Sequence, residues 1–139
     1  MELVSTCCGK LTLDWHGPFS LCLEELQSVP VTLAGVYLLS AFVPSRPVLT
    51  PFYVGQSRDV RRRLSEHLLG QRTFARHLRT RLSTYFSVAA VSDAALRSAA
   101  EAALIRHLQP AGNETVPRAA HVAVSLPLLA VFGPFHGSA

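Results

Sequence analysis

The chain has 139 residues, of which 49% are hydrophobic and 16% charged, and this composition excludes a disordered polypeptide. Its length predicts a single folded domain rather than two. The net charge of +4 is unevenly distributed, because eight of the twelve arginines lie between positions 58 and 81, which favours either a polyanionic partner such as nucleic acid or a solvated helix face.

Cysteine usage and hydropathy narrow the cellular setting. The three cysteines, Cys7, Cys8 and Cys22, lack the paired spacings of a zinc site, and an odd number disfavours a secreted disulfide framework. The first residues have no signal-peptide pattern, and the apolar stretch 122–135 is too short to span a bilayer. We therefore expect a cytoplasmic protein without a membrane span.

The first third of the chain predicts strands and one short helix. We expect residues 1–32 to form an N-terminal extension that packs on the core, with a strand in "LTLDW" and a short helix ending near Pro30. The apolar run 32–43 predicts a buried strand. A proline-rich loop should follow, and "FYVG" predicts a second strand. The loop prolines are Pro44, Pro47 and Pro51.

Helices alternate with one more strand in the next segment. Asp59 is a typical N-cap for a helix over 59–69, which Gly70 would end. A second helix is expected in "TFARHLRTRL", and "TYFSVAAV" predicts a third strand. The third helix should run from Asp93 to Leu108, and residues 115–139 are expected to form a tail or an edge strand of the same domain.

Glu101 is the carboxylate that the pattern singles out. At 100° per residue it falls on the same stripe of the third helix as Leu104, Ile105 and Leu108. A carboxylate that points toward a core needs a cation. The partner could be Arg97 or another arginine, in an internal ion pair, or a metal ion in a cleft.

The order of five motifs resembles the GIY-YIG nuclease family. They are Gly35-Val36-Tyr37, Tyr53-Val54-Gly55, Arg63 with His67 on one helix, Glu101, and Asn113. Either tripeptide alone is a weak signal, whereas all five in order are specific. The resemblance covers about residues 33–114, which would be the catalytic domain. It implies an α/β (α+β) fold, a small three-stranded antiparallel sheet flanked by helices.

The resemblance also implies a catalytic set: Tyr37, Tyr53, Arg63, His67, Glu101 and Asn113. The two tyrosines would line the cleft, Arg63 would hold the scissile phosphate, and Asn113 would support the site. Glu101 would be the sole protein ligand of a divalent metal. His67 stands where some members carry histidine and others tyrosine.

The residue types suit phosphodiester hydrolysis. Mg²⁺, or Mn²⁺ in its place, needs only one or two carboxylates beside phosphate oxygens and water, so Glu101 suffices. Arg63 supplies a permanently charged fork for the phosphate in the transition state. A tyrosine is a poor base unless neighbouring cations favour the phenolate. Tyr37, Tyr53 and His67 therefore stay open as the general base.

Four further residues are expected to contact nucleic acid. Gln56 follows the second tyrosine motif where many relatives have lysine, and it can still donate hydrogen bonds. Arg58, Arg61 and Arg62 would touch phosphates without reading sequence.

The sequence therefore predicts a metal-dependent endonuclease that cleaves DNA. The alternative is a module on the same scaffold that binds nucleic acid or protein without cutting. No separate DNA-reading motif is recognisable, so a protein partner, the segment 1–33 or the C-terminal tail could direct the enzyme to its substrate. The sequence leaves the oligomeric state open.

Overall fold

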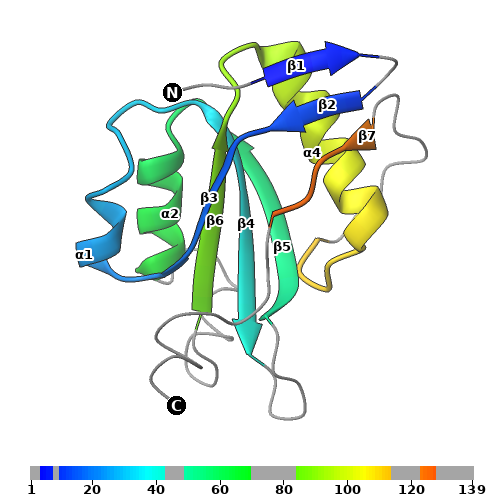
Figure 1. Ribbon diagram of the computed structural model, residues 1–139. Helices are drawn as coiled ribbons and strands as arrows, with labels where there is room; N and C mark the ends of the chain where they lie inside the picture. The colour runs from blue at the N-terminus through cyan, green and yellow to red at the C-terminus, as the bar shows by residue number, and fades with distance from the viewer. Residues whose placement is uncertain (1–3, 8–9, 43–48, 70–83, 114–122, 128–139) are drawn as a thin grey trace.

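The computed structural model describes residues 4–7, 10–42, 49–69, 84–113 and 123–127. These residues form two sheets and three helices (Figure 1). The larger sheet contains, in spatial order, β3 (Trp15–Ser20), β6 (Thr84–Ala90), β4 (Gly35–Phe42) and β5 (Leu49–Ser57). All its neighbouring strands are antiparallel.

The predicted mixed fold is confirmed, but the predicted sheet was one strand too small. The sequence indicated three antiparallel strands, which are β4, β5 and β6, and the structure adds β3 along the outer edge of β6. Gly17 and Pro18 interrupt the strand pattern in this segment, and its register shifts between His16 and Phe19. A pairing that depends on distant residues leaves no periodicity to detect.

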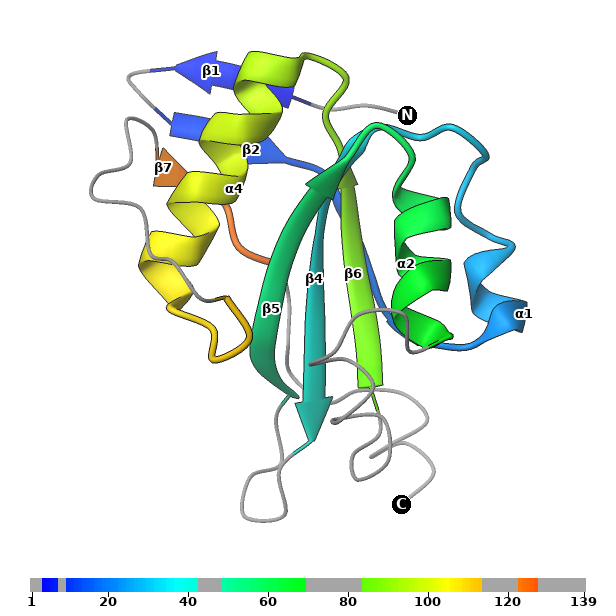
Figure 2. The ribbon, with the colours of Figure 1, turned by 180° about the vertical axis from the view of Figure 1, so that it is seen from behind.

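The smaller sheet contains β1 (Val4–Cys7), β2 (Lys10–Leu13) and β7 (Ala123–Val124). β1 and β2 are antiparallel, whereas β2 and β7 are parallel. This sheet lies beside the helix α4 (Ala94–Leu108) in both ribbon views (Figures 1 and 2). Ser125 fastens the segment after β7, because its hydroxyl accepts a hydrogen bond of 2.8 Å from the backbone of Leu13.

Helices cover both faces of the larger sheet. The helices α2 (Val60–Leu68) and α1 (Leu23–Leu26) lie on one face and α4 on the other (Figures 1 and 2). The central strand β4 is therefore apolar along its whole length, with seven of its eight residues buried. No helix in the described parts of the chain is long and apolar enough to cross a membrane.

Two clusters of buried side chains form the core, one on each face of the sheet. The cluster beneath α4 contains Leu11, Leu13, Val36, Leu38, Val54, Ala89, Val91, Ala100, Leu104 and Ile105. The cluster beneath α1 and α2 contains Leu26, Val29, Tyr37, Leu39, Ala41, Phe52, Val60, Leu64, Phe86 and Val88. Because side chains alternate along a strand, neighbouring residues of β4 enter different clusters. In β5 the alternation is broken at the register shift, where Phe52 and Tyr53 both pack in the cluster beneath α1 and α2.

Both long helices begin where the sequence predicts. The carboxylate of Asp59 accepts a hydrogen bond from the backbone of Arg62, and that of Asp93 from the backbone of Leu96. Each satisfies an amide that the first helical turn leaves unpaired. Helix α4 ends at Gln109, which adopts a left-handed conformation.

One proline prediction was wrong. Pro51 was assigned to the loop, but it lies inside β5, opposite Ser40, where the pairing register with β4 shifts. Proline is tolerated there because β5 is an edge strand and the shift leaves one position without a ladder partner.

Several predictions fall outside the described residues. They are the loop containing Pro44 and Pro47, the helix stop at Gly70, the helix in 73–82 with its arginines, and most of the tail.

Candidate active site

The edge strand β5 divides the candidate residues between two faces of the sheet. Tyr53 and Gly55 face α2, because Tyr53 packs on His67 and Gly55 pairs with Tyr37 of β4. Gln56 faces α4, where its side chain forms hydrogen bonds. Alternation along this strand thus sends the second tyrosine motif toward two different helices.

Two tyrosines and a histidine form a cluster on the α2 face. The hydroxyl of Tyr37 and Nε2 of His67 are hydrogen-bonded at 3.0 Å. The ring centroid of Tyr53 lies 6.1 Å from that of Tyr37 and 5.3 Å from that of His67. Tyr37 and His67 are completely buried, whereas Tyr53 is half-buried. The three candidates for the general base are therefore together, and Tyr53 is the one with exposed surface.

Gly55 makes room for this cluster. A Cβ atom at this position would overlap the phenol of Tyr37, which crosses directly over the glycine. Gly55 lies inside β5, which continues to Ser57. The glycine is required by the close approach of a side chain, not by a turn.

Arg63 lies on α2 in a small charge network. Its Nε lies 3.2 Å from the carboxylate of Glu66, which Arg62 also approaches, at 3.4 Å. The side chain of Arg63 is 31% exposed and that of Arg62 is 74% exposed. Only Nε of Arg63 is engaged within the described residues, so its terminal amino groups keep their donors for an anion.

The other predicted phosphate contacts lie near the start of α2. Arg58 precedes the helix and is exposed, and Arg61 is half-buried in its first turn. With Arg62 they place three guanidinium groups within five residues. These positive charges favour the binding of anions near the N-terminus of the helix, where the helix dipole is also positive.

Glu101 lies on α4 and is half-buried. Its Oε1 accepts a hydrogen bond of 3.2 Å from Nε2 of Gln56. Burial raises the pKa of this carboxyl above its ordinary value of 4.5, and the Gln56 hydrogen bond partly opposes the shift. Among the described residues no cation pairs with it, so its second oxygen is available to a ligand.

Arg97 is a residue that the predicted site omitted. It was considered only as an ion-pair partner of Glu101, but the two do not pair. Gln56 stands between them: its Oε1 accepts a hydrogen bond of 3.2 Å from Nε of Arg97. The signal in the sequence was the spacing of four residues between Arg97 and Glu101, which places both on one helix face.

Asn113 fastens the segment after α4 to the edge strand. Its Oδ1 accepts from the backbone nitrogen of Val54 and its Nδ2 donates to the carbonyl of the same residue, both at 2.9 Å. The backbone nitrogen of Gly112 also donates to Phe52. The side chain of Asn113 thus pairs with the backbone of Val54 as a neighbouring strand would. Val54 lies between Tyr53, which faces α2, and Gln56, which faces α4.

The structure brings the predicted residues together as two groups. Tyr37, Tyr53 and His67 form one group on the α2 face, and Gln56 and Glu101 form the other on the α4 face. The backbone of β5 separates them, and Asn113 holds that backbone. Because β5 is the edge strand, a ligand that reached both groups would lie around this edge.

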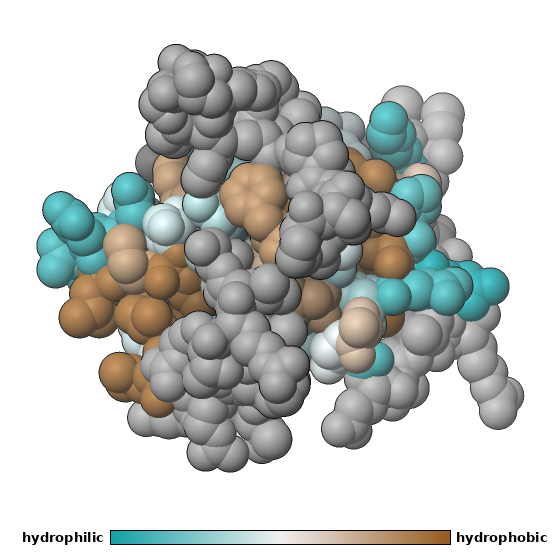
Figure 3. Space-filling model, turned by 90° about the horizontal axis from the view of Figure 1, so that it is seen from below, coloured by the Kyte–Doolittle hydropathy of each residue, from teal (hydrophilic) through white to brown (hydrophobic). Residues whose placement is uncertain are grey.

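The opposite edge of the sheet has a different character. A cavity of about 260 Å³ lies there, lined by residues of β3, β6, α1 and the segment 28–33. The surface on the α1 side contains an apolar area beside hydrophilic groups (Figure 3), and Leu23 and Val31 are 65% and 67% exposed. None of the predicted site residues lines this cavity.

The antiparallel sheet with α2 and α4 on opposite faces is the fold of the GIY-YIG endonuclease domain. The resemblance that the motifs predicted is confirmed at the level of the fold.

Three crystal structures of the GIY-YIG N-terminal endonuclease domain of UvrC from Thermotoga maritima match this chain. Each is a tyrosine-to-phenylalanine point mutant bound to its catalytic divalent cation. The TM-scores are 0.51, 0.51 and 0.50, all at 18% identity, and the matches cover 66–68% of this chain and 99–100% of the domain. No protein-family model and no curated protein matches the sequence.

Proposed function

We propose that this chain is a metal-dependent endonuclease that hydrolyses phosphodiester bonds in DNA. The observation that carries the proposal is Glu101, a half-buried carboxylate without a cationic partner in the described part of the chain. A carboxylate that loses hydration without gaining a counter-ion costs stability. Such costs are typical of functional sites.

The residues around Glu101 suit a divalent cation. No cluster of three or more acidic, histidine or cysteine side chains exists within the described residues. Mg²⁺ and Mn²⁺ are satisfied by one carboxylate when phosphate oxygens and water complete the shell. The solved UvrC domains carry a catalytic divalent cation, which supports the same ligand class here. When bound, such a cation neutralises charge on the phosphodiester.

Arg63 is assigned to the scissile phosphate. Its guanidinium is permanently charged and can donate two parallel hydrogen bonds to phosphate oxygens. Glu66 engages Nε and so fixes the direction of the fork. Arg58, Arg61 and Arg62 would hold the flanking phosphates, which adds affinity without sequence preference.

The aromatic cluster is assigned to proton transfer. Tyr53 is half-buried and is therefore the phenol that an attacking water can reach, whereas Tyr37 and His67 are enclosed. The hydrogen bond between Tyr37 and His67 gives the enclosed pair a route for a proton. Asn113 would keep Tyr53 in place by holding the next residue of β5.

A nicking assay tests the proposal. Purified protein is incubated with supercoiled plasmid in Mg²⁺, and Glu101→Ala is compared with Glu24→Ala, which changes an exposed residue of α1. We expect Glu101→Ala to slow nicking at least about a hundredfold and Glu24→Ala to leave it unchanged. Nicking that survived Glu101→Ala would remove the metal assignment. DNA retardation without cleavage in any metal would favour the non-cleaving module.

A further inference from the structure

Gln56 is held at both ends of its amide by α4. Its Oε1 accepts from Nε of Arg97, and its Nε2 lies 3.2 Å from Oε1 of Glu101. The same Nε2 also lies 3.2 Å from the hydroxyl of Ser98. A side chain expected to contact phosphate is therefore engaged by the helix that carries the candidate metal ligand.

The chemistry of the guanidinium fixes the direction of this amide. Arginine has only donors, so Gln56 must present its carbonyl oxygen to Arg97. Its amino group then necessarily points toward Glu101. A flipped amide would set two donors against each other on one side and two acceptors on the other, so the orientation has one solution.

Arg97 is itself rigidly placed. It is 5% exposed, and its Nη1 donates to the carbonyls of Val91 and Ser92, each at 3.1 Å. These carbonyls belong to the turn that precedes α4. Through Arg97, the backbone at the start of α4 therefore fixes the orientation of Gln56.

This arrangement is costly if it serves only packing. Within the described residues no carboxylate pairs with the buried guanidinium of Arg97, and its acceptors are neutral. A buried charge held in this way is disfavoured relative to an apolar side chain of similar volume. The cost indicates a role for Arg97 beyond the core.

We propose that Arg97 is a positioning residue for the metal ligand Glu101 and acts through Gln56. The inference rests on the proposed function. Arg97 orients the Gln56 amide, and the amide holds Oε1 of Glu101. The second carboxylate oxygen would then be left to bind the cation. Groups that hydrogen-bond a metal ligand in this way commonly contribute ten- to a hundredfold to metal affinity.

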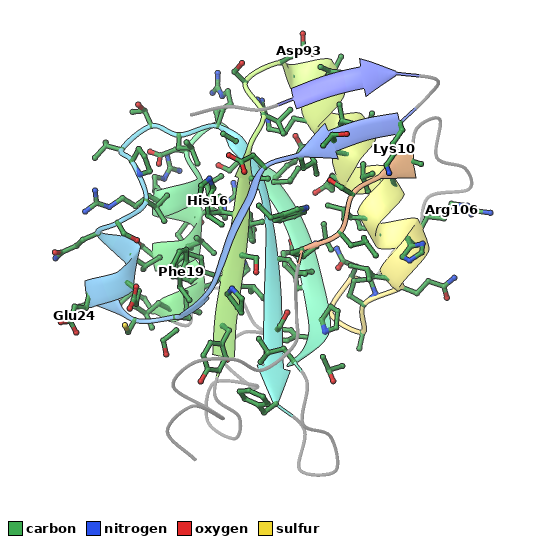
Figure 4. All side chains as sticks on the ribbon, in the orientation of Figure 1. Lys10, His16, Phe19, Glu24, Asp93 and Arg106 are labelled. Atoms are coloured by element: carbon green, nitrogen blue, oxygen red, sulfur yellow. The ribbon has the colours of Figure 1, made fainter. Side chains whose placement is uncertain are left out.

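Metal affinity measured without DNA is the first test. The affinity for Mn²⁺ is determined from the electron paramagnetic resonance signal of the free ion for the wild type, Arg97→Met, Gln56→Met and Arg106→Met. Arg106 is the matched control, since it is on α4 but points away from the sheet (Figure 4). We expect Arg97→Met and Gln56→Met to bind Mn²⁺ about tenfold more weakly than the wild type. The control Arg106→Met should bind it as tightly as the wild type. Unchanged affinity in folded Arg97→Met would overturn the proposal.

Side-chain NMR supplies a readout that needs neither metal nor activity. The two Nε2 protons of Gln56 should exchange slowly with solvent and have shifted resonances in the wild type, and in Arg97→Met they should exchange faster and move toward the resonances of an unconstrained glutamine amide. Signals that did not change would overturn the positioning step. If Arg97→Met fails to fold by circular dichroism, Gln56→Met decides the metal test, because Gln56 is only half-buried.

Nicking separates this inference from the proposed function. A positioning defect should be rescued by more metal, so about tenfold more Mg²⁺ should restore nicking by Arg97→Met but not by Glu101→Ala. Weaker Mn²⁺ binding by Arg97→Met, with no nicking even by the wild type, would remove the nuclease and leave the inference standing. If the wild type nicked DNA and the wild type and Arg97→Met bound Mn²⁺ equally well, the nuclease would stand and the positioning role of Arg97 would be wrong.

Discussion

At the scale of single residues, Glu101 and Gly55 mark positions where the site limits the choice of side chain. Burial raises the pKa of Glu101, and Gly55 lies beneath the phenol of Tyr37. The burial of Glu101 does not improve the packing of the core, whereas Gly55 allows the ring of Tyr37 to pack there. Gly55 is explained by the phenol of Tyr37 beside it, and Glu101 by the cation that we propose. Each can be tested by one substitution.

Glu101→Gln should stabilise the metal-free protein at neutral pH. A raised carboxyl pKa means that the folded state binds the proton more tightly than the unfolded state, so stability falls as pH rises from about 4.5 through the folded pKa. Glutamine retains an acceptor for Gln56 and carries no charge. We expect a gain of about 0.5 kcal/mol at pH 7, measured by urea unfolding, which shrinks toward pH 4.5. A gap that did not depend on pH would contradict this account.

Gly55→Ala should destabilise the fold by about 1–3 kcal/mol, the usual cost of overpacking. The new methyl group would meet the ring of Tyr37. The control is a double-mutant cycle with Tyr37→Leu, in which the same substitution should cost less because the ring is gone. Equal costs in both backgrounds would show that the phenol does not set the requirement for glycine.

At the scale of elements, the sequence predicts what local signals define. Asp59 and Asp93 cap their helices as expected, because capping depends on residues three apart in sequence. β3 was not predicted as a strand of the sheet, because its pairing with β6 is long-range and crosses an irregular register. Gln56 was predicted to contact phosphate because the sequence does not show how α4 packs against β5. In the structure its side chain contacts α4 instead.

The docking of the segment after α4 onto β5 gives a prediction at this scale. Asn113→Ala removes two hydrogen bonds to Val54 and should cost about 1–2 kcal/mol. Asn113→Asp should cost more at neutral pH, because a carboxylate oxygen would then face the carbonyl of Val54.

Acidification distinguishes the two variants. A protonated aspartic acid regains a donor, so thermal unfolding of Asn113→Asp should approach that of the wild type as the pH falls, whereas Asn113→Ala should keep its deficit. Identical pH profiles would mean that the paired hydrogen bonds do not hold β5.

At the scale of the whole molecule, positive charge and the candidate site residues lie near the same edge of the sheet. The first arginines of the arginine-rich segment 58–81 lie at the start of α2, near the strand that carries Tyr53 and Gln56. The opposite edge has exposed apolar side chains on the α1 side and carries Glu24 and Glu25 in that helix. Under the proposed function, we expect a polyanion to approach the α2 and β5 side.

The salt dependence of DNA binding tests this placement. Each phosphate contact releases condensed counter-ions, so removing one contact should reduce the slope of log K against log salt by about 0.9. We expect this reduction for Arg61→Ala, on α2, and no change for Arg106→Ala, on the outer side of α4 (Figure 4). Fluorescence anisotropy with a labelled duplex at several salt concentrations gives both slopes. If both arginines lowered the slope equally, the bound DNA would have to contact α4 as well as α2, and a substrate path along the α2 and β5 side would be wrong.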